Sequence, residues 1–134
     1  MSHTPFWLDE KHNVFPSLQD SLHADVVVIG GGLCGMSAAY HLHQEGLDTV
    51  VLESRTIASG ATGRNAGFIL QGTAERYNRA ITLLGRARAR QIHEWSIRNH
   101  EMMAATIQEE GIDCDYHQNG SLQLAGSPQE EEGS

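Results

Sequence analysis

Three glycines with the spacing of a phosphate-binding turn follow a run of β-branched residues at 26–29; they are Gly30, Gly32 and Gly35. Glycine at such positions lets the chain turn off a strand, lets backbone approach a phosphate, and lets a helix pack closely on the strand. A helix that begins near Leu33 would also direct free N–H groups and its positive dipole end at the phosphates. The candidate cofactor-binding residues at this turn are Gly30, Gly31, Gly32, Leu33, Cys34 and Gly35.

An acidic residue follows at the spacing expected for binding a ribose. A second apolar run at 49–52 ends in Glu53, close to the roughly 20-residue separation typical of dinucleotide-binding units. Its carboxylate can accept hydrogen bonds from ribose hydroxyls and would repel a 2′-phosphate, which argues against NADP. An ordinary strand–helix–strand unit without a nucleotide is the alternative. Strand, helix, second strand and terminal acid occur together here, and this agreement favours the nucleotide.

A second glycine-rich segment, residues 59–68, reads SGATGRNAGF. Small residues at this density let backbone N–H groups line a ligand at close range. Arg64 is a permanent cation that can meet a phosphate or a flavin. From composition alone, a flexible loop with a surface arginine explains the segment equally well.

These elements predict an α/β protein built on a Rossmann-like βαβ unit, with a long helical segment and the start of an α+β substrate domain. Gly46 is expected to end the first helix, and residues 75–110 are expected to be helical with a possible break at Gly85. Asn119-Gly120 between two short apolar runs predicts a hairpin. The predicted segments are an N-terminal arm (1–23), a cofactor-binding unit (24–73), a helical segment (74–111), a hairpin (112–126) and a polar tail (127–134).

Side-chain patterns predict how the arm and the long helix pack. In the arm, aromatic residues are expected to anchor the chain by burial; they are Phe6, Trp7 and Phe15. In the helix, a stripe at spacings of three and four residues is expected to form one packed face. The stripe consists of Ile92, Trp95, Asn99, Met102, Met103 and Ile107.

The segments DVVVIGGG, VVLE and SGATGRNAG together resemble the N-terminal part of the FAD-dependent amine and amino-acid oxidoreductases, the D-amino-acid oxidase superfamily. The γ-glutamylputrescine oxidoreductase branch is the most similar, because it shares the GRN-x-G loop and a W-x-D-type arm, here Trp7-Leu8-Asp9. The first motif occurs in many FAD and NAD proteins. The second, at this distance from the acid, is more specific.

The resemblance implies FAD as the cofactor, with its pyrophosphate on the glycine turn and its adenosine ribose on Glu53. Ser54 and Arg55 would lie next to the adenine. The second loop would follow the pyrophosphate, the ribityl chain and the edge of the flavin. Its implied cofactor-binding residues are Thr62, Gly63, Arg64, Asn65, Ala66 and Gly67. Family members often carry glycine where Ala66 stands, which leaves the local geometry open.

The same resemblance implies an oxidoreductase that transfers a hydride from the carbon beside a substrate nitrogen to the flavin. The substrate would be a small amine or amino acid. Its binding residues are expected beyond residue 134, so no catalytic residue is named. Two alternatives remain: a non-catalytic nucleotide-binding fragment or pseudoenzyme, and an NAD-binding enzyme. The hypothesis of an NAD-binding enzyme does not explain the SGATGRNAGF loop.

Length and composition limit the remaining possibilities. The chain has 134 residues and a net charge of −8, which disfavours nucleic acid and anionic membranes as partners. It lacks an apolar signal-like segment, so a cytoplasmic location is expected. Its eight histidines show no ligand pattern, and no metal site is expected. Members of the resembled family are much longer, and the tail is polar and acidic, so an N-terminal FAD-binding fragment is predicted. Oligomeric state is not indicated.

Overall fold

The computed structural model describes residues 4–9, 13–72, 75–120 and 122, and the chain divides into two units, residues 1–67 and 68–134. Within the described residues, no helix is both long enough and apolar enough to cross a bilayer.

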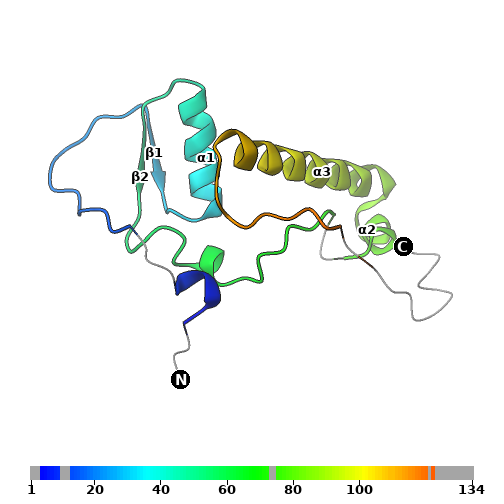
Figure 1. Ribbon diagram of the computed structural model, residues 1–134. Helices are drawn as coiled ribbons and strands as arrows, with labels where there is room; N and C mark the ends of the chain where they lie inside the picture. The colour runs from blue at the N-terminus through cyan, green and yellow to red at the C-terminus, as the bar shows by residue number, and fades with distance from the viewer. Residues whose placement is uncertain (1–3, 10–12, 73–74, 121, 123–134) are drawn as a thin grey trace. The chain divides into compact units, whose positions relative to one another are not determined.

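The first unit contains a strand–helix–strand arrangement with two parallel strands (Figure 1). Strand β1 (Val26–Ile29) pairs with strand β2 (Thr49–Leu52), in a register that sets Val26 beside Thr49 and Ile29 beside Leu52. Helix α1 (Leu33–Gln44) connects them, as parallel pairing requires. This confirms a mixed helix-and-strand fold with the predicted element order.

Helix α1 covers one face of the two-stranded sheet (Figure 1). Val28 points to this face, since its Cγ1 lies against Gly35 of the helix. The alternate residues Val27 and Ile29 are 53% and 87% exposed, because successive side chains of a strand point to opposite faces. Ala39 is the buried residue of α1. Among the described residues, α1 therefore covers one face of the sheet, and the face that carries Val27 and Ile29 is exposed.

The end of α1 follows its glycine signal. Gly46 has φ +82° and directly follows the C-cap residue Glu45, and its N–H donates to the carbonyl of His43 at 2.9 Å. The N–H of Leu47 donates to the carbonyl of Leu42 at 3.2 Å. These bonds satisfy carbonyls that the helix would otherwise leave unpaired, and they confirm the predicted terminator.

The N-terminal arm contains a short 3₁₀ helix, η1 (Phe6–Leu8), and no other helix or strand among its described residues. The predicted burial of the aromatic residues is wrong, because Phe6, Trp7 and Phe15 are 78%, 42% and 70% exposed. Trp7 and Leu8 instead contact a second 3₁₀ helix, η2 (Ala61–Gly63), and the loop that follows it.

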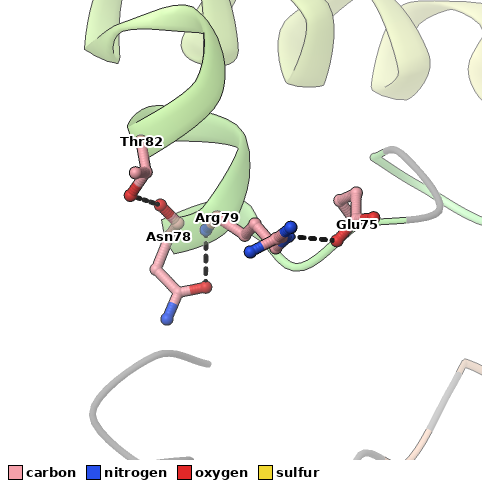
Figure 2. Close-up of polar contacts among 4 residues, drawn as sticks. All are labelled: Glu75, Asn78, Arg79 and Thr82. Atoms are coloured by element: carbon pink, nitrogen blue, oxygen red, sulfur yellow. Dashed lines mark hydrogen bonds and ion pairs between the residues drawn. The ribbon is translucent and has the colours of Figure 1, made fainter.

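The helices of the second unit are α2 (Tyr77–Leu84) and α3 (Arg86–Glu109), which contact each other, and each has one buried alanine, Ala80 and Ala89. The predicted break is confirmed at Gly85, whose φ of +78° and ψ of +152° favour glycine. Polar contacts stabilise the start of α2 (Figure 2). The N–H of Arg79 donates to Asn78 Oδ1 at 2.7 Å, and Arg79 Nε lies 3.2 Å from Glu75 Oε2.

The predicted packed face of α3 is partly wrong. Trp95 and Met102 are 62% and 44% exposed, and Asn99 is also exposed. The covered face lies a fraction of a turn away, because the neighbouring segments meet α3 at polar residues. Ser96 Oγ accepts from the N–H of Gly72 at 2.6 Å, and His100 Nε2 lies 3.0 Å from the hydroxyl of Tyr116. Ile92, Met103 and Ile107 of the predicted stripe do lie on the partly covered face, but the search for apolar spacing missed the polar residues there.

The described part of the predicted hairpin, residues 112–120 and 122, forms no strand, although Gly120 has the positive φ of a turn, +74°. Residues 121 and 123–126 lie outside the described residues, as does the predicted tail 127–134. The hairpin and the start of a substrate domain therefore stay predictions.

Candidate nucleotide-binding site

The chain turns sharply where β1 ends. The N–H of Gly30 donates to the carbonyl of Leu52 at 2.8 Å, which completes the strand pairing, and Gly30 then adopts φ +103°. An L-residue with a side chain is strained at this φ. No atom would lie within 4 Å of a Cβ at Gly30, so its backbone conformation, not crowding, requires glycine.

Gly35 sets the distance between α1 and this turn. A Cβ built on Gly35 would overlap the carbonyl oxygen of Gly30 and would lie 3.3 Å from Cγ1 of Val28. The missing side chain lets the first turn of the helix rest directly on the strand end. This matches the packing role that the spacing assigned to Gly35.

Glu53 lies at the same corner. Its Oε2 accepts from the N–H of Gly31 at 2.8 Å, and its Oε1 accepts from the N–H of Arg55 at 2.9 Å. These two backbone bonds hold the pKa of Glu53 below its usual value, since they favour the charged form. A carboxylate offers about four acceptor positions. Glu53 can therefore keep its place through the backbone and still accept bonds from a ligand.

The first turn of α1 presents unused donors. The N–H of Leu33 donates to Thr62 Oγ1 at 3.0 Å, and the N–H of Met36 makes the first helical bond, to the carbonyl of Gly32. The described residues supply no acceptor for the N–H groups of Gly32, Cys34 and Gly35. Such donors at a helix N-terminus suit an anion, so the residues present fit a pyrophosphate.

The glycine-rich loop is held by a network centred on Asn65. Its Nδ2 donates to the carbonyl of Thr62 at 2.6 Å, and its Oδ1 accepts from the N–H of Gly67 at 2.7 Å. The N–H of Gly63 donates to the carbonyl of Ala58 at 2.8 Å. These bonds hold the backbone of the loop at Gly63 and Gly67, while the side chains of Arg64 and Asn65 are exposed.

The predicted residues do not all make described contacts with the corner. Arg64 Nε donates to the carbonyl of Ser59 at 3.2 Å, within its own loop. Ser54 Oγ lies 3.4 Å from Glu53 Oε1, and Arg55 Nη2 lies 3.6 Å from the Cβ position of Gly60. Cys34 and Ala66 are exposed. The roles assigned to these residues toward the cofactor stay predictions.

Three residues at this site had no role assigned from the sequence. Ile57 packs so closely on Gly31 that a Cβ there would overlap its Cδ1. The N–H of Ala58 donates to the carbonyl of Gly31 at 2.9 Å. The hydroxyl of Ser59 is buried and has no hydrogen-bond partner among the described residues. The sequence offered one signal for this close contact: the variable position of Gly-x-Gly is itself a glycine, Gly31.

Comparison with known proteins places these residues in a wider group. A family model described as FAD dependent oxidoreductase matches residues 25–134. Gamma-glutamylputrescine oxidoreductase of Escherichia coli is 37% identical over 114 residues, covering 82% of this chain and 26% of the relative. No solved structure gives a significant match.

Two further relatives show the breadth of the similarity. A probable oxidoreductase of Haemophilus influenzae is 34% identical over 102 residues, covering 76% of this chain and 24% of its own length. Human mitochondrial dimethylglycine dehydrogenase is 33% identical over 121 residues, covering 90% of this chain and 12% of its own length. The chain thus spans about a quarter or less of these relatives.

Proposed function

We propose a function for this chain from the premise that it belongs to the family of FAD-dependent oxidoreductases. The glycine corner binds FAD, and the strand–helix–strand unit is the Rossmann-like part of an enzyme that oxidises an amine or amino acid. The observation that carries the proposal is the 2.8 Å bond between the N–H of Gly31 and Glu53 Oε2. It brings the proposed ribose acceptor to the proposed phosphate turn.

Each group at the corner has a task that its chemistry suits. The N–H groups of Gly32, Cys34 and Gly35 would bind the pyrophosphate, and the carboxylate of Glu53 would accept from the ribose. Ser54 and Arg55 would border the adenine. Residues Thr62 to Gly67 would follow the ribityl chain and the flavin edge, where Arg64 would balance negative charge.

When bound, FAD would supply the redox chemistry by accepting a hydride from the carbon next to a substrate nitrogen. The described residues orient the cofactor and supply its electrostatic surroundings. Two relatives carry names that refer to amines, a putrescine derivative and dimethylglycine. These names support a small amine or amino acid as the substrate of the whole protein.

Titration of the 134-residue chain with FAD, followed by flavin fluorescence, tests the binding site. We expect FAD to bind and NAD not to displace it. Glu53→Gln is expected to weaken FAD binding about tenfold or more, since a charge-assisted hydrogen bond contributes roughly 1.5–3 kcal/mol.

Glu94→Gln is the matched control. Glu94 pairs with Arg90 on the surface of α3, with Oε1 2.7 Å from Nε. Its replacement removes the same charge but should leave FAD affinity unchanged. Equal effects of the two substitutions, or preferred binding of NAD, would contradict the proposed site.

Anaerobic addition of primary or N-methylated amines to the FAD-loaded protein tests the reaction, since reduction bleaches flavin absorbance. The alternative is a nucleotide-binding fragment or pseudoenzyme without turnover. Retained FAD that no amine bleaches would support that alternative.

A further inference from the structure

The N-terminal arm is attached to the glycine-rich loop by two side chains. Trp7 Nε1 donates to the carbonyl of Asn65 at 2.8 Å, across 58 positions of sequence. The Trp7 ring also lies against Gly67, where an added Cβ would come 2.5 Å from Cζ2. Leu8 contacts Gly63 so closely that a Cβ there would overlap its Cδ2.

The hydrogen bonds continue from the arm to the helix end. Asn65 accepts from Trp7 through its carbonyl and donates through its side chain to the carbonyl of Thr62. Thr62 Oγ1 accepts from the N–H of Leu33, in the first turn of α1. One chain of contacts therefore joins Trp7 to the part of α1 that presents free donors.

We infer that Trp7 and Leu8 are positioning residues that hold loop 61–67 in its ligand-ready shape and thereby set the affinity for FAD. The inference rests on the proposed function for its ligand and on the contacts above for its mechanism. Neither side chain needs to touch the cofactor.

The composition of loop 61–67 explains why the hold that Trp7 and Leu8 have on it, here called the clamp, would matter for binding. Glycines lose more conformational freedom on ordering than other residues, and the loop contains Gly63 and Gly67. A loop that must order on binding weakens binding, whereas a loop ordered beforehand does not. The tight contacts at both glycines confine the loop before any ligand arrives. They also explain why glycine is needed there, since any side chain would displace the arm.

Two measurements on the 134-residue chain test the inference. Hydrogen–deuterium exchange of the ligand-free chain reports the order of loop 61–67, and FAD titration reports affinity. Trp7→Ala is expected to speed exchange in the loop and to weaken FAD binding about tenfold, as loss of a hydrogen bond and an aromatic contact implies. Trp7→Phe keeps an aromatic ring but removes the indole N–H, and it should give an intermediate effect. Leu8→Ala should act in the same direction.

Phe15→Ala is the control, because Phe15 belongs to the same arm but is 70% exposed. It should change neither measurement. Unchanged hydrogen–deuterium exchange of the loop in Trp7→Ala would overturn the inference that Trp7 orders the loop. Faster exchange with unchanged FAD affinity would overturn its role in ligand positioning.

If the unaltered chain takes up no FAD, the proposed function and the ligand-positioning role both fail. The exchange measurement then still decides whether the arm orders the loop. Failure of the site and failure of the clamp are therefore distinguishable.

Discussion

The glycine corner of the first unit and the exposed surface of α2 and α3 in the second unit use their polar contacts differently. In the first, side chains distant in sequence meet at one corner: Glu53 bonds to Gly31, Thr62 to Leu33, and Trp7 to Asn65. In the second, the ion pairs of α2 and α3 join residues four positions apart, Glu75 with Arg79 and Arg90 with Glu94. Contacts of the first kind position backbone donors. Contacts of the second kind support a helix locally.

The difference indicates where substitutions should matter. At the corner, a group is fixed by several partners, so a change at one residue alters the geometry of others. On the helix surface, solvent screens each exposed ion pair, so the pair contributes little to stability. The predictions below test this contrast.

The largest effect is expected from Gly35→Ala. The new Cβ would overlap the carbonyl oxygen of Gly30, so α1 must move away from the strand end. Overpacking of this kind costs about 1–3 kcal/mol, and FAD binding should be lost with the geometry. Thermal unfolding and FAD titration measure both quantities.

Gly46→Ala, at the other end of α1, is the matched control. Nothing lies within 4 Å of its Cβ position, and only its φ of +82° disfavours alanine. A cost of about 1 kcal/mol without loss of FAD binding is expected. If Gly46→Ala were the more harmful of the two, the close approach at Gly35 would not control the site.

A pH dependence is expected from Glu53. Its pKa is lowered in the folded chain, first by the Gly31 N–H and then by the Arg55 N–H. A group whose folded pKa is depressed contributes stability above its unfolded pKa, and this stability is lost as pH falls through the folded value. The free energies of unfolding of the wild type and Glu53→Gln should therefore converge as pH falls below the ordinary glutamate pKa of 4.5 and through the lower folded pKa. Urea unfolding at neutral pH and at a series of acidic pH values measures the two free energies, and a constant difference would contradict the prediction.

Ser59→Ala should have a smaller effect with opposite signs for stability and binding. The buried hydroxyl has no partner among the described residues, and an unsatisfied buried group costs about 1–3 kcal/mol. Alanine should leave the free energy of unfolding unchanged or raise it by about 1 kcal/mol. If FAD supplies the missing partner, affinity falls a few-fold. A clear loss of stability without ligand would show that the hydroxyl already has a partner.

The smallest effect is expected from Glu75→Gln, at the start of α2 (Figure 2). The Glu75 and Arg79 side chains are 55% and 65% exposed, so solvent screens the pair. Its removal should cost about 0.5 kcal/mol or less, and this cost should decrease further in high salt. Urea unfolding at low and high salt checks it. A cost equal to that of Gly35→Ala would remove the contrast between the corner and the exposed helix surface.

Much of the corner could be predicted from the sequence, because its rules are local. A glycine at the end of a strand, a glycine in the first turn of a helix and an acid after the next strand each have one geometric reason. Gly30, Gly35 and Glu53 occupy the places that these reasons require.

The remaining features depend on contacts that spacing does not encode. Trp7 and Asn65 are 58 positions apart, and no local pattern joins them. The covered face of α3 includes Ser96 and His100, which a search for apolar spacing passes over. Trp95 was predicted to lie on the packed face but is exposed, since an aromatic residue on a helix does not by itself mark that face.

The backbone of Ala58 has φ +62°, a conformation that glycine adopts without strain. Glycine at this position would relieve that strain but would also give the unfolded chain more freedom, and the two effects oppose each other. Alanine at this position therefore costs a small local strain in the folded chain but restricts the conformations of the unfolded chain. The carbonyl of Ala58 accepts from the N–H of Gly63 and its N–H donates to the carbonyl of Gly31, so the restricted backbone of this residue helps to hold the two glycine-rich segments together.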